Sequence, residues 1–423
     1  MNILCPPCRI TAACACLLLG AGSAQAEGFS EDAKVGLTLR NFYINRNFVD
    51  PAYPQGKAEE WTQSFILDAR SGFTQGVVGF GMDVLGLYSV KLDGGRGTAG
   101  TQLLPVHDDG RPADDFGRLG VALKARVSAT ELKAGEWSPM LPVLRSDDGR
   151  SLPQTFQGAQ LTSREIDNLT LYGARFRGNS PRNDASMEDL FMAGRPTATS
   201  DRLDILGAEY LFNDKATQLA IWHSDLQDIY RQQYYNLIHS QAVGNWTLGA
   251  NLGYFVGNDS GRSLAGAMDN RTTSLLLSAR TGGHTFYLGL QRVSGDTGWM
   301  RVNGTAGTSL ANDSYNSSYD NAHERSWQLR YDHNFAVDGL PGLQFMTRYI
   351  SGDNVHIGSM RDGKEWGRET ELAYTIQSGT LRDLTVRWRS STLRRDFSSN
   401  AFDEHSNAFD EHRVIVSYPF SIL

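Results

Sequence analysis

Cysteine is missing from all but the first few residues of this sequence. The 423 residues include four cysteines, at Cys5, Cys8, Cys14 and Cys16. All of them lie in a segment that we expect to be cleaved off, so the mature chain would contain no thiol. Disulfide bonds and thiol chemistry are then excluded from the mature protein.

The first 26 residues have the features of a cleaved secretory signal. Arg9 is the only charge of the n-region, Leu17–Leu19 centre a short apolar stretch, and Ala24–Ala26 form an A-x-A cleavage site. A buried N-terminal helix is the alternative, but the pattern favours a signal. We therefore expect a cleaved signal peptide at residues 1–26 and one mature domain at residues 27–423.

Long apolar runs and a basic excess are missing as well. No run is long enough to span a bilayer as a helix, and the mean hydropathy of −0.37 is too polar for a helical membrane protein. The net charge of −7 argues against a nucleic acid partner. The length suggests two soluble domains, yet no linker divides the chain. A large barrel removes this conflict, because it grows by adding hairpins.

Apolar and polar residues alternate in short segments along the whole chain. In one of them, Val121, Leu123 and Val127 share one parity, and Lys124 and Arg126 share the other. Because successive side chains of a strand point to opposite faces, each segment predicts a strand with one apolar and one polar face. The other segments are residues 35–40, 61–70, 246–254, 286–291, 327–332, 384–389 and 413–422.

Two features favour a membrane barrel over a soluble β-sandwich, which would turn the apolar face inward. Long polar segments alternate with short turns, such as 213–215 and 338–342, as long outer loops and short periplasmic turns do. The mature length allows roughly 16 to 20 strands. We therefore expect an all-β transmembrane antiparallel barrel of about 18 strands around an aqueous channel. The second feature is a set of aromatic residues near the predicted strand ends, as in interface girdles: Trp61, Trp327, Trp388, Tyr418 and Phe420.

Basic residues recur with the parity of the polar face. A cation at the lipid midplane costs about 2–4 kcal/mol, so these side chains should face the lumen. Arg387 and Arg389 would project from one strand about 6.5–7 Å apart, and guanidiniums suit carboxylates. We expect about half of the set to pair with inward acids such as Asp68 and Asp332. The set comprises Arg40, Arg70, Lys124, Arg126, Arg330, Arg348, Arg387, Arg389 and Arg413.

A proline-rich region at Glu136–Arg145 and Ser151–Gly158 is unsuited to a central strand. A long loop of this kind would narrow the channel if it folded inward. The alternative is a loop that stays outside.

The segment Ser399–His405 is repeated at once as Ser406–His412. We expect the repeat in a long outer loop just before the last strand. A duplication that a surface loop tolerates is favoured over a divalent-metal clip built from the two Asp-Glu-His triplets.

Catalytic motifs give no support for an enzyme or a cofactor. Residues 27–423 contain no GxSxG, HExxH or P-loop pattern, and the histidines lie mostly in predicted turns and loops. An enzyme or an adhesin that uses its loops remains an alternative class.

Several blocks of the sequence, in order along the mature chain, resemble the OprD family of outer-membrane porins. The resemblance implies an 18-stranded barrel with an inward-folded constriction loop. It also implies passive, substrate-selective uptake of small carboxylate-bearing nutrients. We expect no cofactor and no metal. The blocks are Gly72–Asp83, Leu104–Asp115, Leu152–Gly158, Asp228–Tyr235, Gly342–Tyr349 and Val416–Leu423.

In this family a basic ladder guides the carboxylate, and an acidic patch faces the ladder at the constriction. Carried over by position, the ladder falls on Arg126, Arg387 and Arg389, followed by Arg348 and Lys124, and the acid falls on Asp313.

The resemblance places the protein in the outer membrane of a Gram-negative cell. The expected partners are small carboxylate solutes, outer-membrane lipid and lipopolysaccharide, with no nucleic acid. The sequence leaves open a weak homotrimer or a monomer, and the solute itself: basic amino acids, short peptides, and aromatic or aliphatic acids. The alternative within the same architecture is an unselective general-diffusion porin.

Overall fold

A computed structural model describes residues 28–398 and 407–423. The predicted signal peptide and the first copy of the repeat, Ser399–His405, lie outside these residues, and so does the metal clip that both copies would form. Regular structure in the described ranges is β-strand, apart from the 3-10 helix η1 (Phe335–Asp338). None of the helical structure described there is long and apolar enough to cross a membrane.

Eighteen strands form a single sheet, as the sequence predicted. Short strand pairs lie in two of the connections: β6 (Met140–Leu141) with β7 (Leu144–Arg145), and β10 (Leu190–Phe191) with β11 (Thr199–Ser200). The barrel strands are β1 (Lys34–Phe48), β2 (Lys57–Arg70), β3 (Gly79–Asp93), β4 (Asp115–Val127), β5 (Thr130–Trp137), β8 (Thr155–Ile166), β9 (Leu169–Ser180), β12 (Leu203–Phe212), β13 (Thr217–Leu226), β14 (Tyr230–Val243), β15 (Trp246–Asp259), β16 (Asp269–Thr281), β17 (His284–Ser294), β18 (Arg325–Asn334), β19 (Leu343–Ile357), β20 (Met360–Thr375), β21 (Thr385–Arg395) and β22 (Phe409–Ser421).

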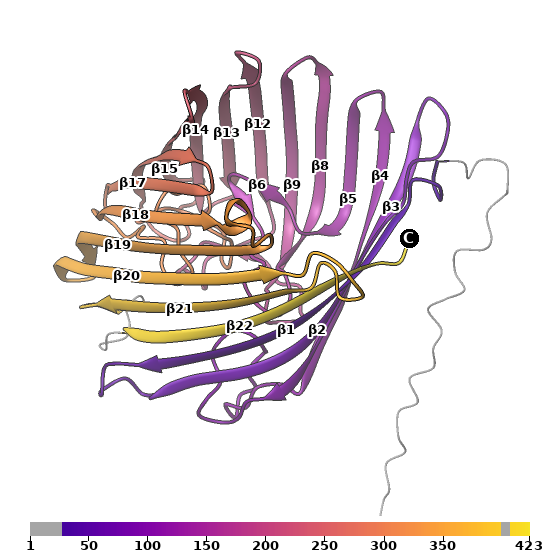
Figure 1. The fold of residues 1–423 in the computed structure, drawn as a ribbon. Coiled ribbons are helices and arrows are strands. Elements are labelled where there is room, and N and C mark those ends of the chain that lie inside the picture. The colour runs from indigo at the N-terminus through magenta and orange to yellow at the C-terminus, as the bar shows by residue number, and fades with distance from the viewer. Residues whose placement is uncertain (1–27, 399–406) are drawn as a thin grey trace, which may run out of the picture.

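Every neighbouring pair in this sheet is antiparallel, and the first strand pairs with the last. The β1–β22 register runs from Gly36 opposite Ser421 to Phe48 opposite Phe409. Figure 1 shows β22, β1 and β2 side by side in the wall, which completes the circle. Closure leaves the 18-stranded sheet of the described residues without an unpaired edge, which a membrane-spanning sheet requires.

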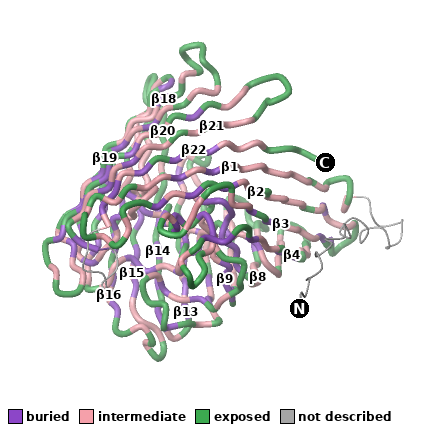
Figure 2. Tube along the Cα trace, turned by 90° about the horizontal axis from the view of Figure 1, so that it is seen from below, coloured by how far each residue is buried: buried purple, intermediate pink, exposed green. Residues whose placement is uncertain are grey.

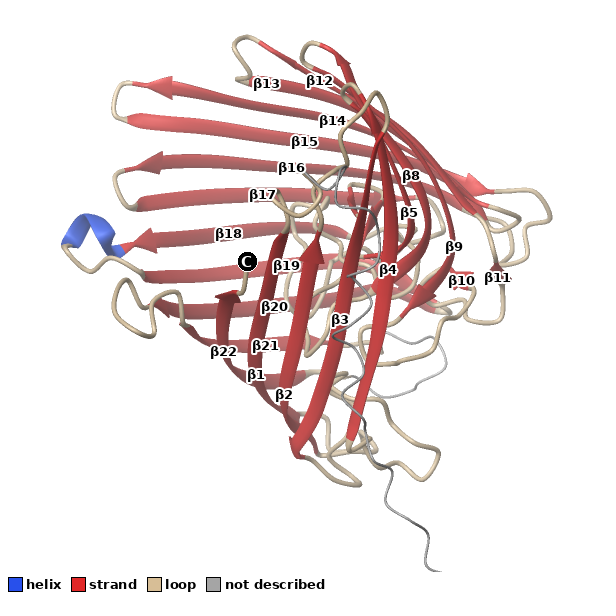
Figure 3. Cartoon of the chain, turned by 90° about the vertical axis from the view of Figure 1, so that its right-hand side faces the viewer, coloured by secondary structure: helices blue, strands red, loops and turns tan. Residues whose placement is uncertain are grey.

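The connections at the two ends of the barrel differ in length. At one end, the turn end, two-residue hairpins such as 244–245 and 282–283 join the strands, and Gly244 and Gly282 adopt φ of 58° and 52° there. Figure 3 shows these turns and η1 along one edge of the sheet. The longest connections, 94–114, 138–154, 181–202 and 295–324, leave the other end, the loop end. The predicted turns at 213–215 and 338–342 both lie at the turn end.

The two faces of the wall have the predicted character. On β4, Leu123 is 63% exposed on the outer face, whereas its neighbour Ala122 is 1% exposed on the inner face. The predicted girdle residues Trp61, Trp327 and Trp388 are also exposed on the outside. Apolar side chains therefore cover the outer face, which is the arrangement of a membrane barrel and not of a sandwich.

Three of the long connections, 138–154, 181–202 and 295–324, pack on one another inside the barrel. Figure 2 shows buried segments of the chain within the wall. The backbone of Ala193 donates to Arg301 at 2.9 Å, and that of Ala306 donates to Arg145 at 2.9 Å. Burial of each large apolar side chain here contributes about 1.5–3 kcal/mol, so the loops form a fixed plug over part of the lumen. Its buried core joins loop residues Leu144, Leu190, Met192, Trp299 and Met300 to wall residues Phe156, Phe176, Trp222 and Phe255.

The second copy of the repeat is not confined to a loop, which corrects the sequence-based prediction. Phe409 begins β22, and it is 3% exposed. Glu411 is buried between two guanidiniums, Arg46 at 2.7 Å and Arg413 at 2.6 Å. Strand β22 extends into the repeat because the Phe409 ring and the Glu411 carboxylate lie at alternate positions and both face inward.

Candidate functional site

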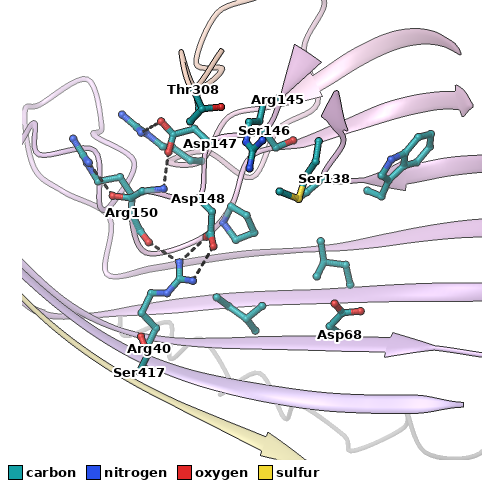
Figure 4. Close-up of a pocket in the computed structure, with 18 of the residues that line it drawn as sticks. Arg40, Asp68, Ser138, Arg145, Ser146, Asp147, Asp148, Arg150, Thr308 and Ser417 are labelled. Carbon is teal, nitrogen blue, oxygen red and sulfur yellow. Dashed lines mark hydrogen bonds and ion pairs between the residues drawn. The ribbon is translucent and has the colours of Figure 1, made fainter. Parts of the chain in front are cut away.

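The inward loops leave a cavity of about 660 Å³ against the inner faces of β1, β2, β3, β21 and β22. Figure 4 shows Arg145 and Asp147 reaching in from the loop 138–154, and Arg40 and Asp68 facing them from the strands. The predicted inward folding of this loop is confirmed. A second loop, 295–324, lines the same cavity through Thr308 and its neighbours, among them Asp313, the acid that the family resemblance indicated.

Arg387 and Arg389 line the cavity side by side, as their shared parity predicted. Both contact Glu371 on the neighbouring strand β20. The Nε of Arg389 lies 2.5 Å from one carboxylate oxygen, and the Nε of Arg387 lies 3.2 Å from the other. The side chain of Arg387 is 38% exposed and that of Arg389 16%. Arg387 is therefore the more accessible to a dissolved anion.

Tyr315, in the loop 295–324, lies against the arginines of this wall. Its hydroxyl donates to Glu371 at 2.8 Å, and its ring centroid is 4.0 Å from the guanidinium carbon of Arg389 and 4.9 Å from that of Arg348. A stacked guanidinium contributes about 0.5–2 kcal/mol. Burial raises the pKa of Tyr315 to about 12, so the phenol stays a donor at neutral pH.

Arg348 is buried behind Tyr315, and the cavity lining does not include it. It donates to Glu369 at 2.7 Å and to the backbone oxygen of Asp313 at 3.0 Å. Glu369 in turn accepts from the backbone N–H of Tyr315 at 3.0 Å. This pair therefore fastens the loop to the wall, and a direct role of Arg348 in a ladder stays a prediction.

Lys124 and Arg126 lie nearer the turn end of β4 and do not line the cavity. Lys124 contacts Asp83 at 2.6 Å, and the guanidinium of Arg126 lies over the Phe73 ring at 4.1 Å from its centroid. The lysine that does line the cavity is Lys133, which holds the second oxygen of Asp83 at 2.6 Å. The structure thus separates Lys124 and Arg126 from Arg387 and Arg389, and their role in a ladder stays a prediction.

Asp313 lines the cavity from the loop 295–324, facing the same space as Arg387 and Arg389. Its Oδ1 accepts a hydrogen bond from Ser318 at 2.7 Å. Burial raises the pKa of Asp313 to about 6, although Ser318, Arg301 and Arg348 oppose the shift. The carboxyl is therefore charged at neutral pH and neutral in mild acid.

This titration predicts a pH dependence of ion selectivity. Between the ordinary aspartate pKa and about 6, folded protein binds a proton at Asp313 that the unfolded chain does not bind, so stability falls as pH rises through this window. Over the same window a negative charge leaves the cavity as pH falls. We expect anion selectivity, measured from reversal potentials in planar bilayers, to rise from pH 7 to pH 5 with a midpoint near 6. In Asp313→Asn this step should be missing, and a wild-type-like step in that variant would contradict the assignment.

Arg40 illustrates a set of contacts that no sequence pattern revealed. It forms two bonds with Asp148, at 2.7 and 3.0 Å, and also donates to the backbone oxygen of Arg150 at 2.8 Å (Figure 4). Asp147 pairs with Arg182, and this guanidinium and the Gly149 N–H hold the pKa of Asp147 below its usual range against the effect of burial. The tip of the loop 138–154 is thus fixed to the wall by charge.

Arg145 differs from its neighbours because its guanidinium has no ion pair or hydrogen bond with any described residue. It lies in β7, lines the cavity, and projects beside Ser146 and Thr308 (Figure 4). A sequence search by strand parity misses it, because its direction depends on how the loop folds.

Ion pairing in the lumen is broader than the predicted half. The expected pairs Arg70–Asp68 and Arg330–Asp332 are present at 2.6 and 2.7 Å. Among the described residues, Arg126 alone of the nine predicted lumen cations has no carboxylate within ion-pair distance. The inner wall is therefore a mosaic of both charges. The remaining pairs are Arg40–Asp148, Lys124–Asp83, Arg348–Glu369, Arg387–Glu371, Arg389–Glu371 and Arg413–Glu411.

Comparisons with known proteins agree with this architecture. A family model described as outer membrane porin, OprD family, matches residues 27–422. The porin-like protein GalP of Pseudomonas putida is 61% identical over 401 residues, which cover 95% of each chain. A crystal structure of a BenF-like porin from Pseudomonas fluorescens Pf-5 is 67% identical, with a TM-score of 0.91 over 93% of this chain and 100% of that one. A crystal structure of Pseudomonas aeruginosa OccK2 in complex with glucuronate is 63% identical, with a TM-score of 0.85 over 94% of this chain and 100% of that one.

Proposed function

Because this chain belongs to the OprD family of outer membrane porins, we propose that it mediates passive, substrate-selective diffusion of small water-soluble carboxylates. It is a channel protein of the Gram-negative outer membrane and not an enzyme. The proposed solutes are amino acids, short peptides or organic acids, and no energy source is needed to move them.

The observation that carries this proposal is that two guanidiniums at the cavity, those of Arg145 and Arg387, are accessible to a dissolved anion. Arg145 has no partner among the described residues, and Arg387 is held by a single contact of 3.2 Å to Glu371. A guanidinium binds a carboxylate through two parallel hydrogen bonds. An entering carboxylate can therefore bind at Arg145 and then compete with Glu371 for Arg387.

Acids in the same lining keep this binding weak. At 4 Å a pair of unit charges is worth about 1 kcal/mol in water and about 4 kcal/mol at an effective dielectric constant of 20. Fixed carboxylates in the lining offset part of the attraction between the guanidiniums and the solute. Conduction requires sites that release a solute as easily as they bind it. The acids of the lining are Asp68, Asp83, Glu136, Asp147, Asp148 and Asp313.

One side of the cavity is apolar, which supports solutes with an apolar body. Ile66, Leu85 and Ile415 line it from the wall, next to the buried ring of Phe42. Apolar contact contributes about 25 cal/mol per Å² removed from water. Within the carboxylates, this flank favours organic acids with a ring or chain over compact zwitterions. The glucuronate bound by the related OccK2 is itself a carboxylate, which supports the solute class.

The second candidate is an unselective general-diffusion porin, which the balance of fixed charges in the lining favours. Liposome swelling separates the two. With a selective channel, we expect propionate to enter faster than alanine and at least about 5-fold faster than ethylamine, since about 1 kcal/mol distinguishes anion from cation. Equal rates for the three solutes would favour the unselective porin.

A further inference from the structure

The lipid-facing side of the barrel carries a group of arginines at the loop end, away from the channel. Arg271 on β16, Arg292 on β17 and Arg325 on β18 share the parity of outward apolar residues, and Arg231 on β14 extends the group. All four are exposed. We refer to these four residues as the basic arc. Figure 1 shows β17 and β18 as adjacent strands of the wall.

Like charges face each other within the basic arc. Arg292 lies directly opposite Arg325, and Arg271 is one diagonal step from Arg292. Directly opposed side chains have Cβ atoms about 4.5–5.5 Å apart, and like charges there are destabilising. A group that bridges both guanidiniums would remove this repulsion.

Carboxylates lie beside three of the four arginines of the basic arc, and Arg292 is the exception among the described residues. Asp353 pairs with Arg325 at 2.8 Å, and Asp269 lies 3.4 Å from Arg271. Arg231 lies directly opposite the outward Asp225 of β13. Arg292 lies opposite Thr273 and Arg325, and it has neither an ion pair nor a side-chain hydrogen bond with any residue that the structure describes. The positive charge without a facing carboxylate is therefore that of Arg292, which lies between Arg271 and Arg325.

The depth of the basic arc places it at the edge of the hydrocarbon. Trp327 and Leu290 are the next outward residues toward the turn end, below Arg325 and Arg292. The Trp327 ring packs on Tyr349, with centroids 5.6 Å apart, and Tyr349 packs on Trp366 at 5.8 Å. Such aromatic rows lie at the membrane interface. One step beyond them lies the level of lipid headgroups.

We propose that the basic arc binds the phosphate groups of an anionic lipid in the leaflet at the loop end. Arginine suits phosphate because its planar fork donates two parallel hydrogen bonds. The acyl chains of the same lipid would lie on the apolar surface around Leu290 and Trp327. Free phosphate has no apolar group that could contact this surface. A phosphorylated lipid therefore fits the site better than a dissolved ion. This site is separate from the channel and does not depend on the solute proposed above.

Native mass spectrometry of the full mature chain in detergent tests the proposal with bisphosphorylated lipid A, its dephosphorylated form and inorganic phosphate as probes. Wild type should retain the phosphorylated lipid about 10-fold better than the dephosphorylated one. In Arg231→Gln/Arg292→Gln this preference should disappear. Arg292 faces no carboxylate in the described part of the chain, and Asp225, opposite Arg231, keeps its hydrogen bond from Ser260 at 2.9 Å. Arg368→Gln is the matched control, because this outward arginine on β20 faces the uncharged Tyr349 and Thr392. It should bind as wild type does.

Thermal unfolding supplies a second readout that a merely structural role would not reproduce. Without lipid, Arg292→Gln should melt at a higher temperature than wild type, because a repulsion is removed. With the phosphorylated lipid, the order should reverse. Channel conductance should stay unchanged in every variant. The proposal is overturned if the double variant keeps the phosphate preference, if the dephosphorylated lipid binds equally well, or if inorganic phosphate stabilises wild type as much as the lipid does.

Discussion

Carboxylate flux is expected to fall about 5- to 30-fold when Arg387 and Arg389 are both replaced by alanine, the range that one to two kcal/mol gives. The change removes two cations from the cavity lining and leaves Glu371 without its contacts at 3.2 and 2.5 Å. The cavity then repels anions that it attracted before. Uptake of radiolabelled carboxylates into reconstituted vesicles and single-channel reversal potentials measure the effect.

Two further variants isolate the cause. Arg387→Ala/Arg389→Ala/Glu371→Gln also neutralises the stranded carboxylate, so part of the flux should return. Arg330→Ala removes a lumen-facing guanidinium that pairs with Asp332 outside the cavity, and it should have little effect. Unchanged flux and reversal potential in the Arg387/Arg389 double variant would remove these arginines from the solute path.

The second large effect is expected from Arg348→Met. This change strands the buried carboxylate of Glu369, and breaking a buried ion pair costs about 3–5 kcal/mol. Because Glu369 also accepts from the backbone of Tyr315, the loop 295–324 should detach from the wall. We expect a wider channel, seen as higher single-channel conductance with more noise, and a lower temperature for heat-induced unfolding.

Arg348→Met/Glu369→Gln is the control for this effect. Glutamine keeps an acceptor for the Tyr315 N–H and removes the stranded charge, so stability and conductance should return most of the way to wild type. A conductance in Arg348→Met equal to that of wild type, despite the lower stability, would show that the loop does not limit flow.

Most of the wall could be predicted from local pattern. Strand parity is set by the chain itself, so residues such as Leu123 and Trp327 are assigned outward from their neighbours alone. The strand number follows from length and the usual strand spacing. Where β22 begins could not be found in this way, because the burial of Glu411 depends on Arg46, which lies 365 positions away in sequence.

The site could be predicted only where it lies on strands. Arg387 and Arg389 follow from parity, and they line the cavity. Arg145 could not be found, because a loop residue takes its direction from long-range packing. Parity also does not predict that Tyr315 covers Arg348, because a strand residue that faces inward can still be buried beneath a loop inside the barrel.

The pairing of the first strand with the last has a consequence for biogenesis. Until β22 is added, β1 and β21 each present a row of unsatisfied N–H and C=O groups, which hydrocarbon penalises by several kcal/mol apiece. The polypeptide therefore has no stable halfway state inside a bilayer. Insertion into the membrane therefore has to follow synthesis of the last strand. Until then, the unfolded chain needs a chaperone that covers its unpaired strands.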